Sequence, residues 1–88
     1  MRSRIVYYGR VQGVGFRWNV ADVIKHFTLT GTVQNLVDGT VEVVLEGDLE
    51  EIKEGKLAIE GRMKGYWITN DIEFKKGEAH FSTFSIIG

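Results

Sequence analysis

The chain has neither cysteine nor proline among its 88 residues. Without cysteine it has no disulfide framework, no thiol nucleophile and no cysteine zinc site. The sequence therefore does not indicate whether the protein works in an oxidising or a reducing compartment. An excess of one charge is also missing, because 11 basic residues face 12 acidic ones, for a formal net charge of −1. This balance argues against a general nucleic-acid binder, whose affinity rests on surplus lysine and arginine.

Long apolar runs are absent as well. The N-terminal residues 1–8 lack the apolar length of a signal peptide, and no run approaches the roughly 20 residues of a membrane span. We therefore expect a soluble protein with no membrane partner and the cytoplasm as its default location. The length predicts a single domain over residues 1–88 with a modest core. His26 and His80 have no carboxylate or second histidine at ligand spacing, so we expect no metal site.

Hydrophobic periodicity predicts the element order β-α-β-β-α-β with a final strand. Strand patterns cover residues 4–8, 31–35 and 40–46, and Asp38-Gly39 predicts a hairpin between the last two of these. An apolar stripe predicts a first helix over residues 16–27. We expect an α+β sandwich, with an antiparallel sheet of about five strands and two helices on one face.

The second helix is less regular. Asp48 is placed to cap it, and Leu49, Ile52 and Ile59 would face inward. Gly55 stands in its middle, where glycine costs about 1 kcal/mol relative to alanine. Beyond this helix, alternation predicts a fourth strand from about residue 66 to 74 and a fifth around residues 84–86.

A glycine-rich motif, GRVQGVGFR over residues 9–17, joins the first strand to the first helix. Gly13 and Gly15 permit backbone conformations closed to other residues, so consecutive N–H groups can converge on one point. No Ser, Thr, Asp or Asn caps the helix start, and Arg17 adds a positively charged guanidinium there. The pattern predicts an oxyanion cradle suited to phosphate; the alternative is an ordinary turn whose donors face water.

Together with a second motif, GTVQNLVDGTVE over residues 31–42, this loop resembles the acylphosphatase family. The similarity is strongest over residues 4–47 and weak beyond. It implies the ferredoxin-like version of the α+β sandwich and metal-independent hydrolysis of the carboxyl–phosphate bond of acyl phosphates. It further implies a monomer that acts on a small acyl phosphate, binds phosphate or sulfate in the loop, and needs no cofactor and no nucleic acid.

By position, the resemblance makes Arg17 the arginine that binds the substrate phosphate and Asn35 the asparagine that orients the attacking water. The backbone cradle it implies consists of Val11, Gln12, Gly13, Val14, Gly15 and Phe16. An acyl phosphate already carries a good leaving group, so catalysis chiefly requires its phosphoryl charge to be held and a water placed in line. For Asn35 there is a structural alternative, because asparagines before a hairpin often bond their own backbone.

The chain also departs from the family pattern. Thr32 stands where tryptophan is common, and Gly55 where a large apolar residue is usual. We expect the second helix to be shortened, or repacked around Trp67 or Met63.

Three further residues are read as ordinary surface. Arg62 and Lys64 fall in a predicted solvated loop, and Trp18 is read as a packing or rim residue. Two other functions remain open. One is a catalytically silent anion-binding or regulatory module of the same fold, and the other is an RNA-binding domain, for which the chain lacks a basic field.

Overall fold

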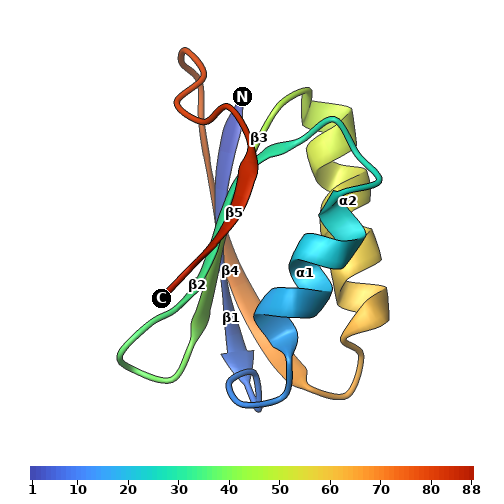
Figure 1. Cartoon of the computed structure of the whole chain (residues 1–88), viewed down its shortest axis with the longest axis vertical. Coiled ribbons are helices and arrows are strands. Elements are labelled where there is room, and N and C mark those ends of the chain that lie inside the picture. Colours follow the sequence, from blue (N-terminus) through green and yellow to red (C-terminus); the bar gives the residue numbers. More distant parts are fainter.

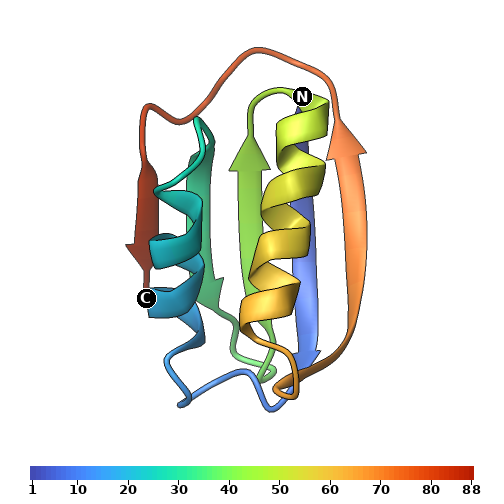
Figure 2. The same cartoon turned by 90° about the vertical axis from the view of Figure 1, so that its right-hand side faces the viewer.

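Two helices cover one face of a five-stranded sheet in the computed structural model, which describes residues 1–88 (Figure 1; Figure 2). The strands lie in the order β4-β1-β3-β2-β5. This arrangement confirms the predicted α+β sandwich and its element order. The elements are β1 (Arg2–Gly9), α1 (Phe16–Ile24), β2 (Thr30–Asn35), β3 (Val41–Glu46), α2 (Leu49–Arg62), β4 (Trp67–Lys75) and β5 (Phe84–Ile87).

The sheet is mixed, so the expectation of a wholly antiparallel sheet is wrong for the last strand. β1 pairs antiparallel with β3 and β4, and β2 antiparallel with β3, but β5 runs parallel to β2. Residues 76–83 carry the chain over one end of the sheet, from one edge to the other (Figure 2). β5 therefore returns opposite to β4, and this is also the direction of β2.

The core lies between the helices and the covered face of the sheet. Strand alternation places Val41, Val43 and Leu45 of β3 inward, and all three are fully buried. The α1 stripe opposes them with Phe16 and Val20, as the helical spacing predicts. On the other face the strands carry charged side chains, such as the ion pair between Arg4 Nε and Glu42 Oε2 at 2.6 Å.

Helix α1 ends three residues earlier than predicted. The N–H groups of His26 and Phe27 bond carbonyls three residues back, which tightens the chain into a turn after Ile24. Thr28 is then held by Glu51 of α2, whose carboxylate accepts from its N–H at 2.7 Å and its hydroxyl at 2.5 Å. These bonds keep the pKa of Glu51 below its usual value.

Helix α2 runs unbroken for 14 residues, so the predicted shortening at Gly55 is wrong. Gly55 is buried, and a Cβ there would lie 2.8 Å from Leu29 Cδ1 and 3.3 Å from Ile24 Cδ1. The three atoms nearest to this position belong to Leu29, Ile24 and Leu45, and not to the expected Trp67 or Met63.

The ends of α2 also differ from expectation. Asp48 stands at the N-cap position without a side-chain capping bond. Leu49 is only half-buried, whereas Ile52 and Ile59 are fully buried. Arg62 is the last helical residue and pairs with Asp22 of α1 at 2.9 Å, so it does not belong to a solvated loop.

Neither helix combines the length and apolar character that a membrane crossing requires.

Candidate active site

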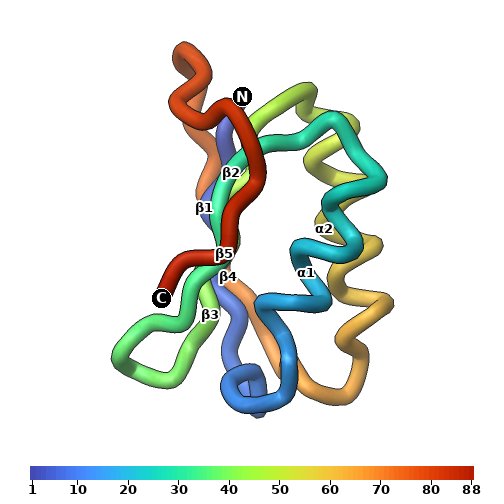
Figure 3. Tube along the Cα trace, in the orientation of Figure 1, coloured from blue at the N-terminus to red at the C-terminus, as the bar shows by residue number.

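Three strand ends and one helix start meet at the same end of the sheet. β1 and β2 both run antiparallel to β3, and β5 runs parallel to β2, so all three finish at one end. The glycine loop, residues 10–15, leaves β1 there and leads directly into α1 (Figure 3). Segments far apart in sequence are therefore brought to one place by topology.

The glycine loop uses the backbone freedom that its sequence predicts. Gly13 has φ of 76° and Gly15 has φ of 77°, both in the left-handed region. Gly15 is the N-cap of α1 and gives no side-chain capping bond. Its carbonyl accepts from the N–H of Asn19 at 3.0 Å and from the Asn19 amide at 2.8 Å, which fixes the loop on the helix. The helix thus begins with donors that no side chain caps.

Arg17 lies in the first turn of α1, beside those donors. Its Nη1 donates a hydrogen bond to the carbonyl oxygen of Gly88. A guanidinium has five N–H donors, so this bond leaves several for a ligand. The contact also holds the guanidinium beside Gly88, the residue that follows β5.

Asn35 ends β2 with its side chain toward the helix-covered face. It follows fully buried Val33 by two residues, and the two therefore share a face. The hairpin beyond it is stabilised by other groups. Asp38 Oδ1 accepts from the Thr40 N–H at 3.1 Å and the Thr40 hydroxyl at 2.5 Å, and these bonds lower the pKa of Asp38. The turn thus does not depend on the Asn35 amide.

A cavity of about 240 Å³ lies where these parts meet. Gly13, Gly15, Arg17 and Asn35 share its lining, although the last two are 18 positions apart in sequence. Of the predicted cradle, Gln12 and Val14 lie outside the lining. The complete lining is Val11, Gly13, Gly15, Phe16, Arg17, Trp18, Asn35 and Ile86.

The acylphosphatase family model matches residues 3–86. The chain belongs to this family. A curated acylphosphatase of Nostoc sp. is 51% identical over 38 residues, which cover 43% of this chain and 38% of that relative. Such alignments span less than half the length of the curated relatives.

Solved structures extend the likeness to the acylphosphatase family over nearly the whole chain. The crystal structure of acylphosphatase from Bacillus subtilis has a TM-score of 0.90 at 30% identity and covers 99% of this chain and 98% of that one. HypF from T. kodakarensis is similar at a TM-score of 0.84 and 25% identity, covering 100% of this chain but 12% of the larger one.

One contribution to the candidate site was not predicted from the sequence. The Gln12 side chain donates to the carbonyls of Leu36 at 2.7 Å and Thr40 at 2.9 Å. It thereby ties the glycine loop to the hairpin that carries Asn35. Its place in the loop motif marked Gln12 only as a backbone donor, because no local pattern indicates the distant carbonyls that it reaches.

The histidines and tryptophans have no part in the predicted chemistry. Both histidines are exposed, and no group of three or more His, Asp or Glu side chains is placed to hold a metal ion. Trp18 is 61% exposed at the cavity rim, one of the two roles expected of it. Trp67 instead packs against Tyr7, with ring centroids 5.9 Å apart.

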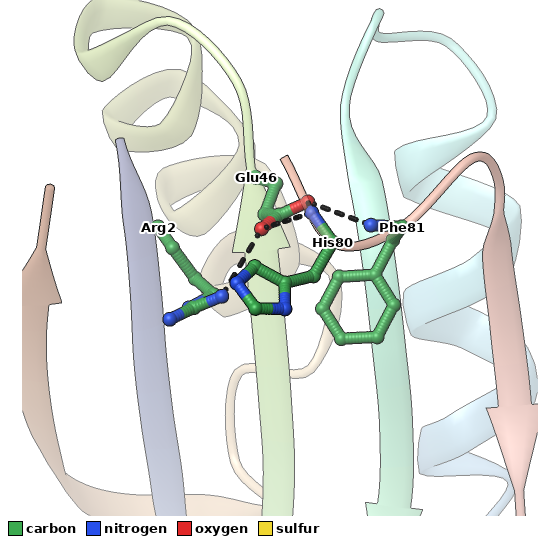
Figure 4. Close-up of polar contacts among 4 residues, drawn as sticks. All are labelled: Arg2, Glu46, His80 and Phe81. Atoms are coloured by element: carbon green, nitrogen blue, oxygen red, sulfur yellow. Dashed lines mark hydrogen bonds and ion pairs between the residues drawn. The ribbon is translucent and has the colours of Figure 1, made fainter. Parts of the chain in front are cut away.

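A buried carboxylate at the opposite end of the sheet has a different task. Glu46 is 4% exposed and accepts from the backbone N–H groups of His80 and Phe81, with Arg2 Nη1 at 3.4 Å (Figure 4). Burial raises its pKa, but the two N–H groups and Arg2 outweigh this, so the pKa lies below the usual value. Glu46 thus fastens the connection between β4 and β5 to the sheet.

Proposed function

We propose that this chain is an acylphosphatase, which hydrolyses the carboxyl–phosphate bond of acyl phosphates to a carboxylate and inorganic phosphate without a metal ion. The observation that carries the proposal is the convergence of an uncapped helix start, two left-handed glycines, Arg17 and Asn35 on one cavity. Family membership and the match to the Bacillus subtilis structure over nearly both chains support it.

In the proposed mechanism the phosphoryl group sits in the glycine loop. Backbone N–H groups and the positive end of α1 bind its oxygens, and Arg17 makes parallel bonds to two of them. Preorganised donors of this kind stabilise equatorial charge as it shifts in the transition state. Because a guanidinium is planar and forked, a lysine would not reproduce this contact.

Asn35 is proposed to hold the attacking water through its side-chain carbonyl. The water oxygen forms a bond to phosphorus as the bond from phosphorus to the acyl oxygen breaks. The acyl group leaves as a carboxylate with the electron pair of that bond, and the water proton passes to a phosphate oxygen. The amide does not titrate, so its role is to place the water in line.

Hydrolysis of benzoyl phosphate by the purified protein in excess EDTA tests this function. We expect turnover well above the uncatalysed rate and no loss on chelation, because the proposed groups are backbone amides, Arg17 and Asn35. A strict requirement for an added divalent ion would contradict the mechanism.

The second candidate is a catalytically silent anion-binding module, which the similarity to part of the larger HypF chain favours. This candidate predicts no turnover in the hydrolysis assay, although the protein would still bind inorganic phosphate. The monomeric state and the cytoplasmic location stay predictions.

A further inference from the structure

The cavity at the glycine loop continues into a groove between α1 and β5. A second hollow of about 300 Å³ shares Trp18 and Ile86 with it and adds Ala21, Asp22 and Lys25. A third of about 380 Å³ shares Ala21 and Lys25 with the second and reaches Phe84. The shared residues make one path from the glycine loop along the length of α1.

The walls of this groove next to the anion cavity are apolar and exposed. Trp18 and Ile86 are 61% and 47% exposed and stand on opposite sides, one on the helix and one on the strand. Trp18, Ala21 and Lys25 follow each other at spacings of three and four residues, so they share one face of α1. A group attached to a bound phosphoryl would meet apolar side chains first.

Positive charge follows one helical turn further on. Lys25 Nζ lies 2.7 Å from Asp22 Oδ1, and Arg62 Nη2 lies 2.9 Å from Asp22 Oδ2. Two cations thus share one carboxylate, which leaves an excess of one positive charge. The Lys25 side chain is 62% exposed and lines the groove beside Asp22. Lys25 Nζ contacts Asp22, and Asp22 follows Arg17 by five residues. The positive charge of Lys25 therefore lies about 7.5 Å of helix rise beyond Arg17.

We infer that the acyl group of the substrate lies in this groove, with an apolar part against Trp18 and Ile86 and a carboxylate at its far end facing Lys25. The substrate class is then the acyl phosphate of a dicarboxylic acid. This inference rests on the proposed function, because the phosphoryl group at the glycine loop sets where the acyl group begins. The spacing suits a benzene ring or a short chain between the two acidic ends.

Benzoyl phosphate and 4-carboxybenzoyl phosphate test the inference, because they differ only in the distal carboxylate and neither cyclises. The readout is a ratio, the kcat/KM for 4-carboxybenzoyl phosphate over that for benzoyl phosphate, with each value first divided by the uncatalysed rate. We expect a ratio above one at low salt that falls toward one in 0.5 M NaCl, where exposed charges are screened. Lys25→Gln should lower the ratio about two- to fivefold, the range of an exposed ion pair, and Lys25→Arg should retain it.

Lys53→Gln is the matched control, since Lys53 also pairs with an acidic residue three positions earlier, Glu50, but on α2 and outside the groove. Its ratio should equal that of the wild type. Turnover of both substrates with a ratio near one, or equal ratios in Lys25→Gln and wild type, would overturn the inference and leave the proposed function intact. Turnover of neither substrate would overturn both.

Discussion

Arg17 and Asn35 line the same cavity, and the proposed mechanism gives them different roles. Arg17 is proposed to bind the phosphoryl group in the ground state and in the transition state. Arg17→Ala should therefore weaken inhibition by phosphate and lower turnover by at least the 10²–10³-fold typical of losing one oxyanion donor. Steady-state kinetics with phosphate as a competitive inhibitor measures both.

The conservative variant sharpens this test. Arg17→Lys should recover little activity, because a point charge lacks the bidentate fork. Arg17 also bonds the Gly88 carbonyl, so far-UV circular dichroism must show that both variants are folded. Near-complete recovery by lysine would contradict the forked contact.

Asn35 is proposed to touch only the attacking water. Asn35→Ala should lower kcat steeply while the inhibition constant for phosphate stays nearly unchanged, the pattern for an interaction made mainly in the transition state. Since Asp38 and Gln12 make the side-chain bonds of the hairpin, we expect this variant to fold. A folded Asn35→Ala with near-normal kcat would mean that the residue has no part in the chemistry.

The sequence indicated these two residues more directly than the contacts that support them. Gly13, Gly15 and Arg17 lie in one short motif whose residue types predict an anion site, whereas Asn35 was named by the family resemblance of the second motif. The Gln12 side chain bonds carbonyls 24 and 28 residues away. Contacts of that range depend on the strand order, which no local pattern encodes.

At the scale of elements, the uncapped start of α1 has a measurable consequence. An anion bound at the glycine loop would satisfy the first-turn donors and stabilise the folded state. At ten times its dissociation constant, phosphate should contribute about 1.4 kcal/mol to the free energy of unfolding. For a chain of this size, Tm should rise by roughly 6–11 °C. Calorimetry against sodium chloride of equal ionic strength measures it, and an unchanged Tm would exclude an anion site there.

Gly55 decides how closely α2 approaches α1. Gly55→Leu should destabilise the fold by about 1–3 kcal/mol, because its side chain would displace the buried Leu29 and Ile24. Gly55→Ala should be nearly neutral, since a helix gain of about 1 kcal/mol offsets a smaller displacement. Urea unfolding of both variants measures these changes.

Gly61→Ala is the control on the same helix, where a Cβ would meet nothing within 4 Å. It should stabilise by up to about 1 kcal/mol. A Gly55→Leu variant as stable as wild type would show that the helices separate without cost. The departure from the family pattern at Gly55 led us to expect a shortened or repacked helix, because the sequence does not show that Leu29 and Ile24 fill the space.

Across the whole molecule, local patterns predicted the layers and the order of the elements but not the direction of the last strand. Alternation and hairpin signals predict all five strands. The direction of the fifth depends on the path of residues 76–83, whose sequence carries no periodicity. Its course across the sheet is fixed partly by Glu46, a residue that alternation assigns to the solvated face and that is instead covered by the connection.

That carboxylate makes the closure of the sheet dependent on pH. The pKa of Glu46 is lowered in the folded state, so its contribution to stability is present above the ordinary glutamate value of about 4.3 and is lost as the pH falls through the lower folded value. Glu46→Gln should thus lose roughly 1–3 kcal/mol at pH 7, where Arg2 is left without its carboxylate, and much less at pH 3. Urea unfolding at both pH values, with amide exchange at His80 and Phe81, measures this.

Glu73→Gln is the control, because Glu73 is exposed and pairs only with Arg4 at 3.5 Å. Its effect on stability should be small, and the exchange of the His80 and Phe81 amides should not change. An equal loss for Glu46→Gln at both pH values would mean that the residue acts by packing and not by its charge.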